Sequence, residues 1–165
     1  KEICDSLDLS ILPPGRFEIF KVKGAAGDKT VGMGQGDNGD ALKANIQFMQ
    51  TYTGQKSENT LFIYTTPDEG EEEIFEDHLS SITSLNPPMI YVVPGRESIE
   101  AAREYYEIIK TKLPAEFYPV SHEDMDKRIN KIQQLVKESS YQYVMVSGCG
   151  PEQYMWGNLK SKLKK

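Results

Sequence analysis

Residues 143–163, YVMVSGCGPEQYMWGNLKSKL, join a buried strand to a helix through a short glycine-rich turn. The first six residues are apolar or small and carry no charge. Trp156, Leu159 and Leu163 then recur at spacings of three and four, the period of one helix face. A strand that passes directly into a helix in this way is the repeating unit of a parallel α/β sheet.

Three further segments show the same continuous hydrophobicity as YQYVMVSG (141–148): TLFIYTT (60–66), PPMIYVVPG (87–95) and AEFYPV (115–120). Continuous rather than alternating hydrophobicity indicates a strand that is buried on both faces between helix layers. The segments between them show helical spacing, and parallel strands are joined by right-handed helical crossovers. The sequence therefore predicts an α/β fold, a three-layer, Rossmann-like open sheet of about five mostly parallel strands flanked by helices.

The first 59 residues leave two alternatives open. RFEIFKVKG (16–24) alternates apolar and polar residues, which is typical of a half-exposed strand, and ALKANIQFMQTY (41–52) has the spacing of a helix. This region is either a fifth strand–helix unit or a hairpin packed on the edge of the sheet. We expect residues 1–28 to form an N-terminal arm and edge strand, and residues 29–165 to form the Rossmann-like domain.

Composition excludes some functional classes. A net charge of −6 without a basic stripe argues against binding of long nucleic acids. No apolar run approaches the roughly 20 residues of a membrane span. The two cysteines, Cys4 and Cys149, do not form a disulfide framework by themselves, so we expect a soluble protein in a reducing, cytoplasmic compartment. The chain opens with Lys1 rather than Met, which suggests a fragment or a processed form.

The turn at 147–152 is the leading candidate for a ligand site, because ligands of open α/β sheets bind beyond the carboxyl ends of the strands. Gly148 and Gly150 permit positive φ and close backbone approach, and Ser147 adds a hydroxyl. Pro151 suits the first position of a helix whose free N–H groups attract anions. Cys149 lies where a helix N-terminus can lower a thiol pKa, although the sequence supplies no partner base. The alternative is a turn that serves only the fold.

A second candidate is GMGQGDNGD (32–40), in which Gly34 and Gly36 belong to a GxGxG pattern that could cradle a phosphate. A flexible surface loop is the alternative. Asp37, Asp40 and the acidic run DEGEEE (68–73) match no metal-binding loop, so we expect solvated acids and no metal site.

Further candidates follow other strand ends. Thr66 closes the strand at 60–66, and Arg96 follows the strand at 87–95, where a guanidinium could pair with a phosphate or form a surface salt bridge. We expect His78 at the edge of the core and His122 in a structural role at a helix start.

Two family resemblances involve the same turn. CGPEQYM (149–155) resembles the turn of ferredoxin-reductase-type NAD(P)-binding modules, which implies NAD(P)H against residues 32–36 and 149–151 and a flavin partner. Residues 60–163 also resemble the Rossmann-like ligand-sensing domains of CRISPR-associated proteins, which implies a nucleotide-type ligand bound across a homodimer, with GPEQYM (150–155) as the binding turn.

These observations predict a module that binds a small nucleotide-type ligand, as a sensor or as part of a larger assembly. The alternatives are an NAD(P)H-binding reductase module that needs a flavin partner, and a non-catalytic domain that binds a protein partner. NAD(P) or another nucleotide is therefore the expected cofactor class. The absence of a nucleophile motif or a Walker lysine favours binding over catalysis.

Overall fold

The computed structural model describes residues 16–54, 59–120, 124–150 and 153–165. Within them the chain runs in the order β1 (Glu18–Gly24), β2 (Gly27–Gln35), α1 (Gly39–Thr53), β3 (Thr60–Thr66), α2 (Glu72–Leu85), β4 (Ile90–Pro94), α3 (Ile99–Ile109), β5 (Ala115–Phe117), α4 (Met125–Glu138), β6 (Tyr143–Gly148) and α5 (Gln153–Leu163).

The six strands of the described residues form one sheet in the order β1-β2-β6-β3-β4-β5. All neighbouring pairs are parallel except β1 and β2, which form an antiparallel hairpin at one edge. Both alternatives for the first 59 residues thus hold in part. The segment 16–24 belongs to an edge hairpin, and β2 with α1 also begins a strand–helix–strand unit.

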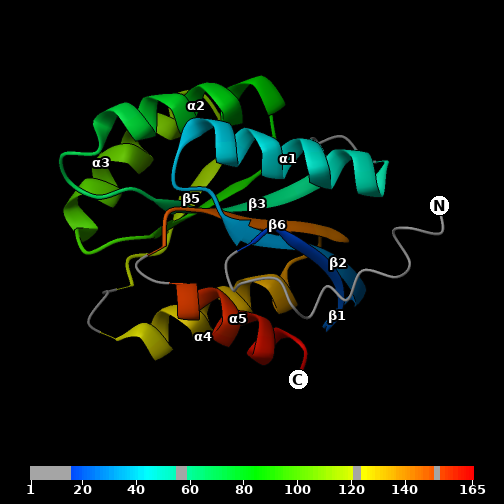
Figure 1. Cartoon of the computed structure of the whole chain (residues 1–165). Helices are drawn as coiled ribbons and strands as arrows, with labels where there is room; N and C mark the ends of the chain where they lie inside the picture. Colours follow the sequence, from blue (N-terminus) through cyan, green and yellow to red (C-terminus); the bar gives the residue numbers. More distant parts are fainter. Residues whose placement is uncertain (1–15, 55–58, 121–123, 151–152) are drawn as a thin grey trace.

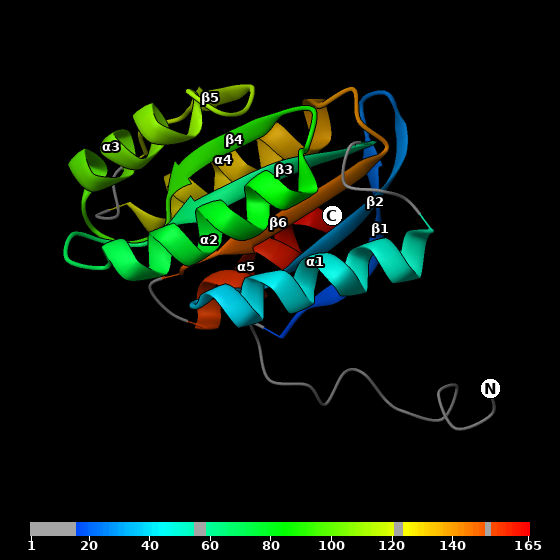
Figure 2. The same ribbon diagram turned by 90° about the horizontal axis from the view of Figure 1, so that it is seen from above.

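Helices cover both faces of the sheet, with α1, α2 and α3 on one face and α4 and α5 on the other (Figures 1 and 2). The connections from β2 through β5 all advance in one direction, so right-handed crossovers place their helices on the same face. The connection from β5 to β6 runs back across three positions, which places α4 on the opposite face. The predicted three-layer, Rossmann-like α/β sheet is confirmed.

The continuous hydrophobicity of the central strands has a direct structural cause. Every residue of β3 is buried. Its side chains alternate between two cores. Leu61 and Ile63 pack against α4 and α5, and Phe62 and Tyr64 pack against α1 and α2 on the other face of the sheet. Trp156 is 1% exposed in the first of these cores. The described residues include no helix with the length and apolar character needed to cross a bilayer.

Candidate functional site

The strand order creates a switch point at the carboxyl ends of β2, β6 and β3. The chain leaves β2 and β3 toward one face of the sheet, and it leaves β6, which lies between them, toward the other. Open α/β sheets bind ligands in the crevice that such a reversal creates. The loops after β2, β3, β4 and β6 meet there, and they carry most of the residues that the sequence singled out.

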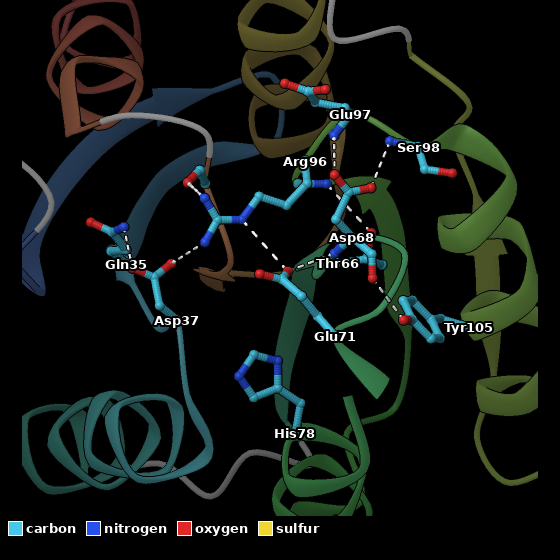
Figure 3. Close-up of polar contacts among 12 residues, drawn as sticks. Gln35, Asp37, Thr66, Asp68, Glu71, His78, Arg96, Glu97, Ser98 and Tyr105 are labelled. Atoms are coloured by element: carbon cyan, nitrogen blue, oxygen red, sulfur yellow. Dashed lines mark hydrogen bonds and ion pairs between the residues drawn. The ribbon is translucent and has the colours of Figure 1, made fainter. Parts of the chain in front are cut away.

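Arg96 lies at the centre of these loops (Figure 3). Its Nη1 donates to the carbonyl oxygen of Gly150 at 2.9 Å. Its Nη2 lies 3.6 Å from Oδ1 of Asp37, and its Nε lies 3.8 Å from Oε2 of Glu71. The Arg96 side chain is 27% exposed. We call Asp37, Glu71, Arg96, Arg128 and Gly150 the Arg96 site.

The acidic residues around Arg96 are held in place rather than freely solvated. Gln35 Nε2 donates to Oδ2 of Asp37. Glu71 Oε2 accepts a hydrogen bond from the Asp68 N–H at 2.8 Å. Asp68 in turn accepts the Ser98 N–H at 2.9 Å and ties the loop after β3 to the start of α3. Asp37, Asp68 and Glu71, which we expected to be solvated, are only partly exposed and are bonded to backbone N–H or arginine groups.

Arg128 was not singled out in the sequence, yet it holds the backbone of the loop that carries Arg96. It is the fourth residue of α4 and is fully buried. Its Nη1 donates to the Gly95 carbonyl at 3.1 Å and its Nη2 to the Arg96 carbonyl at 2.9 Å. Among the described residues no carboxylate lies within 4.0 Å of its guanidinium. The inward spacing of Met125, Arg128 and Ile132 was the available sequence signal.

Buried polar atoms without a hydrogen-bond partner gather at this end of the sheet. Among the described side chains there are six, and each belongs to a strand end, to a loop after a strand, or to the first half of a helix that follows. Three of them are N–H groups that only donate, on arginine and tryptophan side chains. Buried polar groups are normally paired, so unpaired ones mark a site that requires explanation. The six atoms are Asp37 Oδ1, Thr65 Oγ1, His78 Nε2, Arg96 Nε, Arg128 Nε and Trp156 Nε1.

The turn after β6 is built by close backbone contacts. Gly148 has φ 139°, a conformation that favours glycine. Its carbonyl accepts the Gly36 N–H at 2.7 Å, and the Cys149 N–H donates to the Thr65 carbonyl at 2.9 Å. A Cβ at Gly150 would lie 2.9 Å from Trp156 Nε1. Pro151 lies outside the described residues.

The predicted glycine loop at 32–40 is wrong in part, because β2 continues through Gln35. Gly34 is therefore a strand residue, and a Cβ there would lie 2.5 Å from Cα of Phe17. This glycine lets the chain before β1 pass close over β2. Gly36 directly follows the strand and remains at the candidate site.

Two predicted hydroxyl groups are engaged within the fold. Ser147 Oγ donates to the Gly34 carbonyl at 2.8 Å and accepts from Asn45 Nδ2 at 3.0 Å. Thr66 is buried, and its Oγ1 accepts the Gly95 N–H at 3.4 Å. Their roles toward a ligand stay predictions.

Burial changes the pKa values of two titratable groups in this region, the Asp37 carboxyl and the Cys149 thiol. Burial raises the pKa of Asp37, and the Arg96 guanidinium partly opposes this. Burial likewise raises the pKa of the Cys149 thiol to about 12, with a further contribution from Asp37. A helix N-terminus can lower a thiol pKa, but at Cys149 burial has the larger effect and raises it. Among the described residues no cluster of His, Cys, Asp and Glu is arranged to hold a metal ion.

His78 is buried beneath the site (Figure 3), and its Nδ1 lies 2.9 Å from the Tyr64 hydroxyl. Burial lowers the pKa of His78 to about 4, while the carbonyls of Asn38 and Gly36 act in the opposite direction. The ring is therefore neutral at pH 7. We expected His78 at the edge of the core, and the structure buries it completely. His122 lies outside the described residues.

Comparison with known proteins bears on the fold. No protein-family model matches the sequence, and no curated protein is significantly similar to it. A solved structure of the murein peptide ligase Mpl from Psychrobacter arcticus 273-4 is similar, with a TM-score of 0.52 and 12% sequence identity. The fold is Rossmann-like. The match covers 92% of this chain and 30% of that protein, so the chain corresponds to less than a third of the ligase.

Proposed function

We propose that this module binds a nucleotide-type ligand at the Arg96 site, as one part of a larger assembly. The ligand's phosphate would interact with Arg96 and with the backbone N–H groups of the loops around it. The position of the site at a switch point of a parallel sheet supports this assignment.

One observation carries the proposal, namely that the buried side-chain atoms without hydrogen-bond partners gather at this end of the sheet. Arg96 Nε, Arg128 Nε and Trp156 Nε1 are donors, and they sit where a phosphate would be expected to bind. Arg96 has one hydrogen bond to a carbonyl and only longer contacts to Asp37 and Glu71, so it can turn toward an anion at small cost.

The larger assembly is suggested by the similarity to Mpl, a ligase of which this chain spans 30%. We include in the proposal a cytoplasmic location, with which the free, buried thiol of Cys149 agrees. The reductase alternative is weaker, because the glycine stretch proposed to hold NAD(P)H lies largely within β2.

A non-catalytic interaction domain is a second candidate. Phe48 and Tyr52 on α1 are 53% and 64% exposed, and their rings stack with centroids 6.5 Å apart. Such exposed aromatic rings are typical of protein contacts. This candidate becomes the leading one if no nucleotide binds.

The test is calorimetric titration of the protein with ATP, UDP, NADPH and a cyclic oligoadenylate. We expect one of them to bind, and Arg96→Ala to weaken its affinity about tenfold or more, since a hydrogen bond to a charged group is worth about 1.5–3 kcal/mol. Arg103→Ala is the matched control, because that guanidinium lies over the Phe117 ring and takes no part in the hydrogen bonds and ion pairs given above for the Arg96 site. Absence of binding, or an equal loss in both variants, would contradict the proposal.

A further inference from the structure

A groove lined by lysines lies at the opposite end of the sheet from the Arg96 site, and it has a volume of about 400 Å³. It is bounded by β1, by the start of β2, and by the ends of α4 and α5. Five of its eight lining residues are lysines and one is an aspartate. The lining residues are Lys21, Val22, Lys23, Asp28, Lys137, Leu163, Lys164 and Lys165.

The lysines of this groove lack carboxylate partners. Among the described residues, no Asp or Glu oxygen lies within 4.0 Å of any of the five ammonium groups. Other lysines of the chain do have such partners, such as Lys162 with Asp126 at 3.0 Å. A chain with a net charge of −6 thus leaves five cations together and unpaired. Their charge is available to an anionic partner.

Local roles account for only part of this cluster. Lys137 lies in the last turn of α4, where a cation is favoured by the helix dipole. Lys21 Nζ donates to Thr30 Oγ1 at 2.5 Å, and Lys164 lies over the Phe20 ring. None of these contacts neutralises charge, and none explains why residues of two strands and two helices converge on one groove.

The groove adjoins β1, which is the edge strand of the sheet formed by the described residues. Successive side chains of a strand point to opposite faces, so Lys21 and Lys23 lie on one face of β1 and Val22 on the other. All three nevertheless line the groove, which indicates that the groove runs along the edge of this strand. β1 has seven residues and is the last strand in the sheet order, with β2 as its neighbour. No other strand of the described residues pairs with its outer edge, so that edge offers backbone N–H and C=O groups to an added strand.

We propose that this edge binds an extended acidic segment of a partner protein. The segment adds as a strand beside β1, and its carboxylates lie against the five lysines. A nucleic acid fits less well, because none of the eight described residues that line the groove is aromatic and could stack on bases, and the net negative charge of the chain repels a long polyanion.

The probe is a fluorescein-labelled 12-residue peptide of alternating glutamate and valine, whose binding is followed by fluorescence anisotropy at 50 and 200 mM NaCl. We expect the double variant Lys137→Glu, Lys164→Glu to weaken binding about tenfold or more, and the higher salt to weaken binding to the native protein. The matched control is Lys43→Glu, Lys112→Glu, two exposed lysines outside the groove with the same change of net charge. We expect the control to retain most of the affinity.

A second readout tests the strand pairing. Hydrogen exchange of the β1 amides is expected to slow when the peptide is bound, and a peptide with proline in place of valine is expected to bind weakly, because proline has no N–H to donate. The proposal is overturned by absence of binding at 50 mM NaCl, by equal losses in both double variants, or by unchanged exchange in β1. Tighter binding of a 12-nucleotide oligothymidylate than of the peptide would also overturn it.

Discussion

A Cβ atom on Gly148 would overlap the carbonyl oxygen of Thr65, the residue that faces Gly148 across the β3–β6 pair. The φ of 139° at Gly148 is itself unfavourable for any residue with a side chain. The end of β6 is thus pressed onto β3 where the loops of the Arg96 site begin.

Gly148→Ala is expected to destabilise the protein by about 3 kcal/mol or more, since backbone strain and a steric overlap act together. The measurement is urea unfolding followed by the fluorescence of Trp156, the single tryptophan of the chain. Gly54→Ala is the control, because Gly54 has φ 62° with open space around its Cβ position. That variant should lose only about 1–2 kcal/mol. Equal losses would show that the contact with Thr65 is unimportant.

Arg128→Met is expected to weaken both stability and ligand binding. The change leaves the buried carbonyls of Gly95 and Arg96 without their donors, which costs about 1–3 kcal/mol and is partly offset by removal of a buried charge. Because Arg128 holds the backbone of Arg96, affinity for the nucleotide should fall as well. Unfolding and calorimetric titration measure the two effects. If both quantities match those of Arg103→Met, Arg128 does not support the site.

Asp37→Asn is expected to raise the melting temperature at pH 7. Burial raises the pKa of Asp37, so the folded protein holds this proton more tightly than the unfolded chain does, and ionisation above the raised pKa costs stability. An amide avoids that cost. The gain should shrink in thermal scans at pH values below the ordinary aspartate pKa near 4, where the native carboxyl is protonated in both states. A lower melting temperature at pH 7 would show that the contact with Arg96 outweighs desolvation.

His78 is expected to make stability depend on pH between about 4 and 6.5. Its pKa is lowered to about 4 in the folded protein, so the unfolded chain binds more protons in this window and stability falls as the pH falls through it. In His78→Asn, whose amide can still accept the Tyr64 hydroxyl, the slope should flatten. The measurement is the free energy of unfolding of the native protein and of His78→Asn at several pH values. The other histidine, His122, is present in both proteins, so the difference between their slopes reports on His78. An unchanged slope would assign the pH dependence to other groups.

The location of the candidate site was predictable, although much of its composition was not. Arg96 and the turn at 148–150 follow strands that are recognisable from their hydrophobicity, and the carboxyl ends of parallel strands meet at one edge. Asp68 and Glu71 lie in an acidic run that looks solvent-facing in the sequence, and Arg128 shares the inward spacing of its helix but carries a charge that is rarely buried. Their roles depend on contacts with residues about 30 positions away, such as Arg128 with Gly95 and Asp68 with Ser98.

Local patterns were sufficient for the elements themselves. The strand predicted at 60–66 coincides with β3, because burial on both faces requires an unbroken apolar run. The helix predicted at 41–52 lies within α1, because one apolar face requires a period of 3.6 residues. These requirements act between near neighbours in the chain, so the sequence displays them directly.

Strand order and electrostatics were decided by the tertiary structure. The insertion of β6 between β2 and β3 produces the switch point, and it depends on packing between residues more than 80 positions apart, such as Leu61 and Val144. The raised pKa of Cys149 depends on desolvation by the surrounding loops, which a local helix terminus does not reveal. The sequence thus determined the central strands, the helices and the edge where a ligand would bind, but not the glycine-rich strand β2. Long-range packing determined which side chains meet at that edge and in which charge state.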